Sequence, residues 1–374
     1  MASAPSAAVR PLAVLVTLGD PRQLTGGYLY HRRLAALAPA HGWRLVFASV
    51  PEGPFPLPAL AARQVVRHAL RHRPRAVIVD SIAAAYLAPA LRDLAAVPLL
   101  GSLHQSPGGI DHGPLRTALQ ARLDLLVYRR AARLLVASEL LAKQLAAQGL
   151  PRQRLCVVPP GRDVAPLPDG PLPDLRQGRA AAFLCVGNWI PRKGILPLLD
   201  AFARLPPAAG TLHLVGNDDV DRAYAARVRE RLARADLRGR VVVHGPVSPA
   251  RVAQLYAAAD VFVLPSTREP FGTVYGEAMA MGLPVVGFAA GNLPYLASDG
   301  VEGRIVPVGD TAALARALRE LADDPALRAR LGAAARRRAS RRPTWEQTAA
   351  RFFGAVRAVA EHCSGGEHGG APAP

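Results

Sequence analysis

Two glutamates eight residues apart, Glu269 and Glu277, lie in the segment of this 374-residue chain that best suits chemistry on a phosphorylated ligand. The segment VFVLPSTREPFGTVYGEAMAMGLPVV, residues 261–286, predicts a buried strand, a loop, a helix and a second strand. We expect Glu269 in the loop at the carboxyl end of the strand and Glu277 in the first turn of the helix. A carboxylate accepts hydrogen bonds from hydroxyl groups, so Glu277 suits a ribose and Glu269 a sugar.

The start of the predicted helix suits an anion. The first amides of a helix have no intrahelical acceptor, and the helix dipole favours negative charge beside them. A diphosphate therefore fits the main-chain N–H groups of Phe271, Gly272 and Thr273. Taken singly, Glu277 could simply complement the helix N-terminus and Glu269 could be a solvated loop residue; their joint setting favours ligand binding.

A basic pair follows another predicted strand in FLCVGNWIPRKGILPLLDAF, residues 183–202. The strand ends at Gly187, and a loop then presents Arg192 and Lys193 before the next helix. Two cations at a strand end would neutralise the charge that develops on a departing diphosphate. An exposed basic turn is the alternative interpretation.

In the first half of the chain, Gly26 and Gly27 separate the first predicted strand from the first helix. Glycine there allows a close approach of backbone and ligand. The pair is not a GxGxxG fingerprint, and none follows any candidate strand, which counts against a dehydrogenase. His104 follows a strand in PLLGSLHQSPGG, where it is a candidate site residue or a structural histidine.

The segment with the two glutamates resembles the signature of the family 4 retaining glycosyltransferases, E-P-F-G…E-A-M-A-x-G-x-P-V-V. The resemblance extends from about residue 12 to residue 355 and includes VASELLAKQL, VVPPGRDV and DTAALARALRELADDPALRARLG. It implies two facing Rossmann domains, the GT-B arrangement, and transfer from a nucleoside-diphosphate sugar. It also implies that Arg192 and Lys193 neutralise the diphosphate, and that His104 lies near the donor sugar and the reacting bond. The loop of Gly26 and Gly27 would then line the cleft near phosphate and acceptor.

Some residues depart from the family pattern. Gly291-Asn292 and Tyr295 stand where a Gly-Gly loop and a glutamate are usual. In similar enzymes this loop contacts the donor sugar, so the departure affects which sugar is bound. Asn217 and Asp218 stand where a second glycine is common, so the contact with the nucleotide base is expected to differ from that of the family. Asp219-Val220-Asp221 matches a DxD metal motif, but its position before a helix favours turn and cap chemistry. Because the GT-B class needs no metal for its leaving group, we expect no metal and no cofactor beyond the donor.

Short apolar runs alternate with helical segments along the chain, which predicts parallel strands joined by crossover helices. The fold class is therefore α/β, with two Rossmann-like domains that are each a doubly wound parallel sheet, and a cleft between them. The expected domains are 1–165 on the acceptor side, completed by a C-terminal helix 344–361, and 179–343 on the donor side. A proline-rich linker, 166–178, joins them, and a tail, 364–374, is expected to be disordered. The predicted strands are 12–17, 44–49, 76–79, 98–102, 133–137, 155–158, 182–186, 211–215, 240–244, 261–264, 284–287 and 304–306.

The net charge of +18 raises the question of an anionic partner. Arg63, Arg67 and Arg71 recur every four residues in a predicted helix and form a basic stripe, which suits peripheral contact with an anionic membrane. Solvated surface charge is the equal alternative. Nucleic acid is not expected, because no motif for it accompanies the charge. Three cysteines without ligand spacing indicate neither a disulfide framework nor a zinc site.

No signal peptide and no apolar run of membrane-spanning length is visible, so we expect a cytoplasmic protein, with peripheral contact at the inner membrane surface as an open alternative. The predicted activity is that of a retaining hexosyltransferase. Its acceptor could be a glycan, a lipid or a small molecule. Two alternatives stay open: a GT-B phosphorylase or epimerase, and a nucleotide-sugar-binding protein without catalysis.

Overall fold

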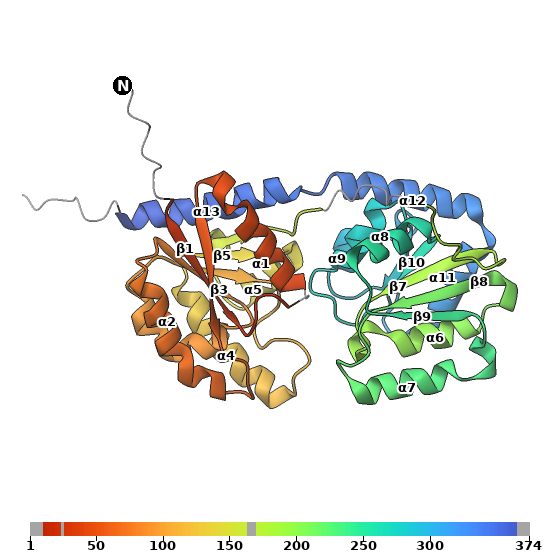
Figure 1. The fold of residues 1–374 in the computed structure, drawn as a ribbon, viewed down its shortest axis with the longest axis horizontal. Coiled ribbons are helices and arrows are strands. Elements are labelled where there is room, and N and C mark those ends of the chain that lie inside the picture. The colour runs from red at the N-terminus through yellow and green to blue at the C-terminus, as the bar shows by residue number, and fades with distance from the viewer. Residues whose placement is uncertain (1–9, 24–25, 163–169, 365–374) are drawn as a thin grey trace, which may run out of the picture. The chain divides into compact units, whose positions relative to one another are not determined.

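The computed structural model of the protein describes residues 10–23, 26–162 and 170–364. Contacts within the chain divide it into two compact units. Unit 1 comprises the chain up to Gly161 and the residues from Trp345 onward, and unit 2 runs from Arg162 to Thr344 (Figure 1). Each unit contains one sheet of six parallel strands with helices on both of its faces.

The unit 1 sheet has the strand order β2-β1-β3-β4-β5-β6. Its strands are β1 (Leu12–Leu18), β2 (Arg44–Val50), β3 (Ala76–Asp80), β4 (Leu99–Leu103), β5 (Arg133–Val136) and β6 (Leu155–Val157). Its α-helices are α1 (Gly26–Leu37), α2 (Ala62–Arg71), α3 (Leu91–Leu94), α4 (Pro114–Arg130), α5 (Glu139–Ala147) and α13 (Trp345–Ser364). Two 3-10 helices matter below, η2 (Leu57–Ala61) and η3 (Ala84–Ala90).

The sequence of β1 explains how the unit 1 sheet is buried on both faces. Successive side chains of a strand point to opposite faces. Leu12, Val14 and Val16 accordingly belong to one buried cluster, with residues of α2, α4 and α5. Ala13 and Leu15 belong to a second cluster, with residues of α1 and α13. A strand that is apolar at five successive positions, Leu12 to Val16, therefore requires helices on both sides.

The last helix, α13, packs on the unit 1 sheet although it follows unit 2 in the sequence. Its Phe352, Phe353 and Val356 are buried in the same cluster as Leu15. Thr348 also donates a hydrogen bond to the carbonyl oxygen of Pro159, at 3.0 Å. The predicted tail, 364–374, lies outside the described residues except for Ser364, which ends α13.

The unit 2 sheet has the strand order β12-β11-β10-β7-β8-β9. Its strands are β7 (Ala181–Val186), β8 (Gly210–Val215), β9 (Val241–Gly245), β10 (Val261–Val263), β11 (Val285–Phe288) and β12 (Gly303–Val306). Its α-helices are α6 (Ile195–Ala203), α7 (Arg222–Leu232), α8 (Pro249–Ala258), α9 (Thr273–Ala280), α10 (Leu293–Leu296), α11 (Thr311–Asp323) and α12 (Pro325–Ser340), and a 3-10 turn, η5 (Pro191–Lys193), precedes α6.

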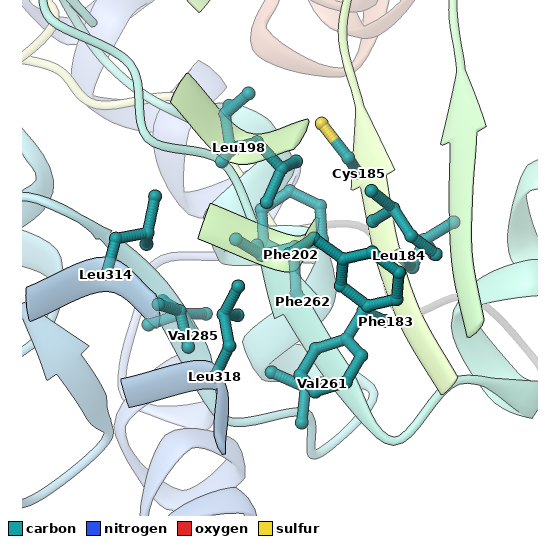
Figure 2. Close-up of a cluster of buried hydrophobic side chains, with 14 of the residues drawn as sticks. Phe183, Leu184, Cys185, Leu198, Phe202, Val261, Phe262, Val285, Leu314 and Leu318 are labelled. Atoms are coloured by element: carbon teal, nitrogen blue, oxygen red, sulfur yellow. The ribbon is translucent and has the colours of Figure 1, made fainter. Parts of the chain in front are cut away.

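Aromatic and branched side chains fill the core of unit 2 (Figure 2). Phe183 on β7 meets Phe202 on α6 edge to face, with ring centroids 5.9 Å apart. Phe262 on β10 meets Tyr275 on α9 in the same way, at 5.6 Å. These contacts fix the helices that follow β7 and β10 against the sheet, and both of these connections contribute site residues below.

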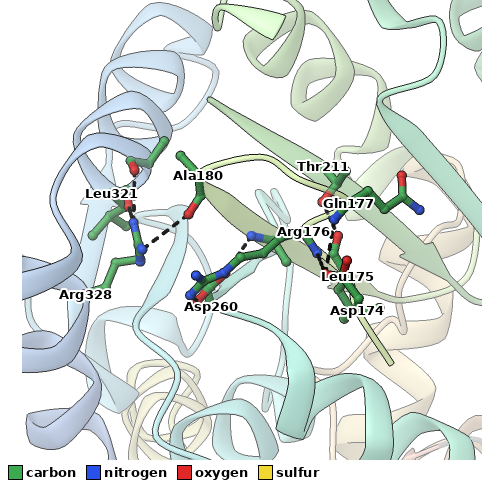
Figure 3. A network of polar contacts seen from close by, with 11 residues as sticks. Asp174, Leu175, Arg176, Gln177, Ala180, Thr211, Asp260, Leu321 and Arg328 are labelled. Atoms are coloured by element: carbon green, nitrogen blue, oxygen red, sulfur yellow. Dashed lines mark hydrogen bonds and ion pairs between the residues drawn. The ribbon is translucent and has the colours of Figure 1, made fainter. Parts of the chain in front are cut away.

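Part of the predicted linker, 166–178, is packed into unit 2. Residues 163–169 lie outside the described residues, but Leu175 is buried in the unit 2 core. Arg176 forms a two-pronged ion pair with Asp260, with Nε 2.8 Å from Oδ2 (Figure 3). In the same view, the buried Arg328 of α12 donates to the carbonyl oxygens of Leu321 and Ala180. Leu175 and Arg176, at the end of the predicted linker, are thus anchored in unit 2.

Each of the twelve predicted strands is present, with ends that differ by one residue or not at all. The expected fold class, α/β with two Rossmann-like doubly wound parallel sheets, is confirmed. Two helices of unit 1 adjoin 3-10 segments: a 3-10 turn, Ala38–His41, follows α1, and η2 precedes α2. Within the described residues, no helix combines the length and apolar character needed to cross a membrane.

Candidate functional site

The candidate site of unit 2 lies where the direction of the sheet's connections reverses. From β7 the chain proceeds through β8 to β9 on one side, and it then returns to place β10 on the other side of β7. In open parallel sheets, ligands bind beyond the carboxyl ends of the strands at such a point. The residues after β7 and after β10 therefore meet at the position where a ligand is expected.

Lys193, Arg192 and Glu269 meet at this edge of the sheet. Lys193 Nζ lies 2.6 Å from Glu269 Oε2, and Arg192 Nη1 lies 3.7 Å from the same oxygen. The side chains of Lys193 and Glu269 are only 12% and 11% exposed. Arg192 also donates to the carbonyl oxygen of Arg268, at 3.2 Å. The structure thus brings together two cations and one carboxylate, which the sequence placed on separate segments.

Two glycines shape the loop that carries the basic pair. A Cβ atom at Gly187 would lie 3.4 Å from Cδ of Lys193, so the lysine side chain passes close over the glycine. Gly194 has a φ of +70°, and a Cβ atom there would lie 2.0 Å from the carbonyl oxygen of Pro265. Only glycine fits this close approach of the loops after β7 and β10.

The loop that carries Glu269 is fixed by the segment where the sequence departs from the family pattern. The carbonyl oxygen of Glu269 accepts a hydrogen bond from the amide of Asn292, at 2.8 Å. Asn292 Nδ2 donates to the carbonyl oxygen of Phe271, at 2.9 Å. A Cβ atom at Gly291 would lie 2.3 Å from the Glu269 carbonyl oxygen. Gly291 and Asn292 therefore position the glutamate loop, whereas Tyr295 on α10 is exposed.

Helix α9 begins directly after Gly272, whose φ of +78° is left-handed. Thr273 is the first helical residue, so Glu277 lies in the second turn. The expectation that Glu277 occupies the first turn was wrong, because the helix starts too late to include it there. Glu277 is exposed. The first amides of a helix have no intrahelical acceptor, so the N-terminus of α9 suits an anion.

Tyr256 and Arg342, which the sequence did not single out, flank Glu277. Tyr256 Oη donates to Glu277 Oε2, at 3.1 Å, and burial, followed by the charge of Glu277, raises the pKa of the tyrosine well above its ordinary value. Arg342 lies over the Phe271 ring, 5.2 Å from its centroid. Burial lowers the pKa of Arg342, and the Glu277 charge opposes that shift. No local motif marks either residue. Tyr256 lies more than twenty positions before Glu277, and Arg342 lies after the end of α12.

The Asp219–Asp221 segment is a turn and a helix cap, as predicted. Asp221 accepts a hydrogen bond from the amide of Tyr224, at 2.9 Å, and caps α7. Asp218 forms an ion pair with Arg229 of the same helix. Asn217 O accepts from the amide of Trp189, at 2.8 Å, which ties the loops after β8 and β7 together.

In unit 1, His104 belongs to a buried polar cluster with His31 of α1, Asp80 of β3 and Ser102 of β4. His104 Nε2 lies 3.1 Å from His31 Nε2, and Ser102 Oγ lies 3.0 Å from His31 Nε2. His31 Nδ1 lies 3.4 Å from Asp80 Oδ2. Burial lowers the pKa of His31 and of His104 to about 3, so both rings are neutral at neutral pH.

Among the residues that the structure describes, His31, Asp80 and His104 form the one group whose ligand atoms could hold a metal ion, all lying within 4.8 Å of one another. The glycine pair opens α1 beside this cluster. A Cβ atom at Gly27 would lie 3.9 Å from His104 Cδ2, and one at Gly26 would meet no atom within 4 Å. The sequence found His104 and the glycines but missed His31 and Asp80.

Two family models match the chain on either side of the boundary between the units. The model of the glycosyl transferase 4-like domain matches residues 8–161, and the model of glycosyl transferases group 1 matches residues 175–338. The chain belongs to the group 1 glycosyltransferases. This confirms the resemblance drawn from the two-glutamate segment.

Curated relatives carry glycosyltransferase names. A D-inositol 3-phosphate glycosyltransferase of Xylanimonas cellulosilytica is 38% identical over 215 residues, which is 54% of this chain and 51% of the relative. One of Mycolicibacterium smegmatis is 32% identical over 267 residues, 65% of this chain and 58% of the relative. The chain spans about half the length of the curated relatives it matches.

Solved structures share the fold over nearly the whole chain. Sucrose-phosphate synthase of Thermosynechococcus elongatus has a TM-score of 0.80 at 23% identity, covering 94% of this chain and all of the other. HepE of Anabaena, solved in complex with UDP and glucose, has a TM-score of 0.75 at 22% identity, covering 92% of this chain and 99% of the other. At these identities the likeness establishes the GT-B fold.

Proposed function

We propose that the protein is a retaining glycosyltransferase that moves a sugar from a nucleoside-diphosphate donor to an acceptor yet to be identified. The observation that carries this proposal is the contact of Lys193 and Arg192 with Glu269 at the switch point of the unit 2 sheet. Two cations and one carboxylate at the edge where open parallel sheets bind their ligands suit a ligand that carries a diphosphate and hydroxyl groups. Family membership supports the same activity.

In this proposal the diphosphate binds at the start of α9, with Lys193 and Arg192 on its other side. The two cations neutralise the charge that grows on the diphosphate as the glycosidic bond breaks. Glu269 accepts hydrogen bonds from sugar hydroxyls, and Glu277 accepts them from the ribose. His104 contacts the donor sugar, and Gly26 and Gly27 admit phosphate and acceptor close to the backbone.

Retention of configuration follows if the acceptor hydroxyl attacks from the face that the diphosphate leaves. An oxygen of the departing phosphate then takes the acceptor's proton, so no side chain need form a covalent intermediate. Because Lys193 and Arg192 already provide the positive charge for the leaving group, we propose that the reaction proceeds without a metal ion. A cytoplasmic location stays a prediction of the sequence.

Donor cleavage by purified protein tests the proposal directly. A panel of UDP-, GDP- and ADP-sugars would be assayed for nucleotide release, with and without EDTA, and with inositol phosphates among the trial acceptors. UDP-sugars come first, because HepE was solved with UDP. Slow release from one donor, unaffected by EDTA and lost in Lys193→Ala and Glu277→Ala, supports the proposal. Binding without cleavage of any donor, at every acceptor tried, would move the non-catalytic alternative ahead.

We further propose that unit 1 contacts an anionic membrane through α4 and η2. Leu60 and Leu115 are 85% and 87% exposed. Exposed apolar side chains that gather in a patch mark a site of interaction with a partner or a membrane. Leu115, Leu119, Arg122 and Leu126 follow one another at helical spacing on the outer face of α4. Arg116 lies 5.3 Å from the Phe55 ring, so the start of α4 lies beside the segment that leads into η2.

The predicted arginine stripe contributes less than this leucine surface. Arg63 donates to the Pro89 carbonyl oxygen, at 2.9 Å, and Arg67 forms an ion pair with Asp93, at 3.1 Å. Sedimentation with vesicles of anionic lipid at low salt tests the contact. The double variant Leu115→Ser, Leu119→Ser should lose binding, whereas Val220→Ser, which removes an exposed residue of unit 2, should not. Equal binding of the wild type to zwitterionic vesicles would contradict charge complementarity.

A further inference from the structure

Arg342 follows the end of α12 and lies against the first turn of α9. Its guanidinium carbon is 5.2 Å from the centroid of the Phe271 ring, two residues before the helix begins. A Cβ atom at Gly276, in that first turn, would overlap Nη1 of Arg342 and lie 2.9 Å from its Cζ. Because Gly276 has no side chain, the guanidinium occupies this space and lies against the residue that directly precedes Glu277.

The backbone of Arg342 is held in place within unit 2. Its amide donates to the carbonyl oxygen of Ala339, at 3.0 Å, and its own carbonyl oxygen accepts from Arg162 Nε, at 3.2 Å. The amide of Arg162 donates to the carbonyl oxygen of Pro343, at 2.8 Å. Hydrogen bonds at Arg342 and at the next residue thus fix the backbone from which the guanidinium reaches α9.

The charge of Arg342 is not neutralised by a direct contact in the fold. Among the residues that the structure describes, none accepts a hydrogen bond from the guanidinium or forms an ion pair with it. Burial lowers the pKa of Arg342 and the charge of Glu277 opposes that shift, but an arginine stays protonated in either case. Arg328 of α12 differs, since three backbone carbonyl oxygens accept from its buried guanidinium. The charge of Arg342 is therefore available to act on a neighbouring charge or a ligand.

Two negative charges meet at the start of α9 in the proposed donor complex. Glu277 accepts hydrogen bonds from the ribose while the diphosphate binds at the first amides of the same helix, so the carboxylate repels the ligand that it helps to bind. The other glutamate of the site, Glu269, has its charge offset by Lys193, at 2.6 Å. Tyr256 donates to Glu277 through a hydroxyl group that carries no charge. Arg342 brings a cation to this second glutamate.

We propose that Arg342 is a positioning residue of the donor site: its charge offsets that of Glu277, so that a carboxylate and a diphosphate are accommodated together at the start of α9. The inference rests on the proposed function and extends it by one residue. Arg342 acts through Glu277 and need not touch the donor. Loss of Arg342 should therefore weaken the binding of a nucleoside diphosphate, whereas binding of the nucleoside, which lacks the phosphates, should change little.

Three variants separate the charge of Arg342 from its packing on Phe271. Arg342→Met keeps a side chain of similar length and removes the charge, and Arg342→Lys keeps the charge and removes the planar group. The control is Arg240→Met, which also removes a buried guanidinium that lies over an aromatic ring, 4.8 Å from the centroid of Phe202. Arg240 precedes β9, at the sheet edge opposite the candidate site, so this variant should lower the melting temperature and leave nucleotide affinity unchanged.

Isothermal titration calorimetry of the full chain with UDP, GDP and ADP, and with the nucleoside of each diphosphate that binds, provides the first test. Arg342→Met should bind the diphosphate roughly tenfold more weakly than the wild type. Arg342→Lys should recover most of that loss, and all of the variants should bind the nucleoside as the wild type does. Equal affinity of the wild type and Arg342→Met for the diphosphate would overturn the proposal. Equal losses in the Met and Lys variants would also overturn it, because packing on Phe271 would then account for the effect.

A double-mutant cycle with Glu277→Gln provides the second test. With a neutral side chain in place of the carboxylate, Arg342→Met should cost about threefold or less in affinity for the diphosphate, since no negative charge is left to offset. The same roughly tenfold loss in both backgrounds would contradict the proposal, because Arg342 would then act on the diphosphate without Glu277. In steady-state kinetics, Arg342→Met should raise the donor KM and leave kcat nearly unchanged. A wild type that binds none of the three diphosphates would refute the proposed function as well, which distinguishes that failure from a failure of Arg342 alone.

Discussion

Replacing Lys193 by methionine tests whether the lysine acts on the donor or only on Glu269. Methionine keeps the length and apolar stem of lysine and removes its charge. Glu269 would then retain one cation, Arg192 Nη1 at 3.7 Å, in place of two. Since Coulomb energy varies inversely with distance, the remaining contact is worth about 70% of the one lost at 2.6 Å.

These distances set the expected loss of stability. Breaking a buried ion pair outright costs about 3–5 kcal/mol. Because Arg192 stays, Lys193→Met removes somewhat over half of the electrostatic attraction between Glu269 and the two cations. We therefore expect the free energy of unfolding to fall by about 2–3 kcal/mol. For a unit of this size, that corresponds to a fall in melting temperature of roughly 4–12 °C. Turnover should fall by about 10²–10³-fold, as for loss of one donor to a developing anion.

The double variant Lys193→Met, Glu269→Gln separates the two roles of the lysine. Removing both partners of an ion pair is often close to neutral, so stability should recover toward the wild type. Turnover should stay low, because the charge that faces the diphosphate is still absent. Recovery of turnover in the double variant would refute the reasoning, since Lys193 would then serve only to neutralise Glu269.

A matched control comes from the opposite edge of the same sheet. Arg176 and Asp260 form an ion pair in which Asp260 immediately precedes β10, whereas Glu269 follows it. Arg176→Met should lower the melting temperature and leave kcat and KM unchanged. The assays are calorimetry at fixed pH and nucleotide release at saturating donor.

Three further variants test other contacts. Tyr256→Phe removes the hydroxyl that donates to Glu277 at 3.1 Å, and should raise the donor KM by roughly tenfold, the lower end of what one hydrogen bond to a charged group contributes, with kcat nearly unchanged in steady-state kinetics. Gly194→Ala adds left-handed strain and a Cβ atom 2.0 Å from a carbonyl oxygen, so its melting temperature should fall well below that of Gly149→Ala, where φ is +84° and nothing lies within 4 Å; equal melting temperatures would contradict the close approach. Burial raises the pKa of Asp124 to about 7, so the folded state holds a proton that the unfolded state releases near pH 4, and stability is lost as pH rises from about 4 to 7. Asp124→Asn should remove this contribution, so that its stability relative to the wild type, measured by denaturant titration, increases across that window and is constant above it.

The sequence predicted those features that depend on neighbouring residues. Strands such as β7 and β10 are short apolar runs, and the glycines and charges after them mark their ends. Glu269, Lys193 and Gly187 could therefore be found from their local setting. The exact start of α9 could not, because the left-handed Gly272 fixes it, and this moved Glu277 from the first turn to the second.

Residues that reach the site from distant segments could not be predicted. Arg342 follows α12 and yet lies over Phe271, and a Cβ atom at Gly276 would overlap its guanidinium. His31 lies in the second turn of α1, and its burial, which brings it to His104, is not visible in the sequence. Such contacts depend on how helices pack across a sheet, which a single sequence does not specify.

The two polar clusters occupy equivalent positions in their own sheets and carry different chemistry. In unit 1 the connections reverse between β1 and β3, and there Thr17 donates to Asp80 at 2.8 Å. In unit 2 they reverse between β7 and β10, and there Lys193 meets Glu269. A switch point supplies a crevice without deciding what binds, so the side chains decide. Cations in unit 2 suit a diphosphate, whereas the neutral imidazoles of unit 1 suit uncharged hydroxyl groups, which is the division of roles that glycosyl transfer requires.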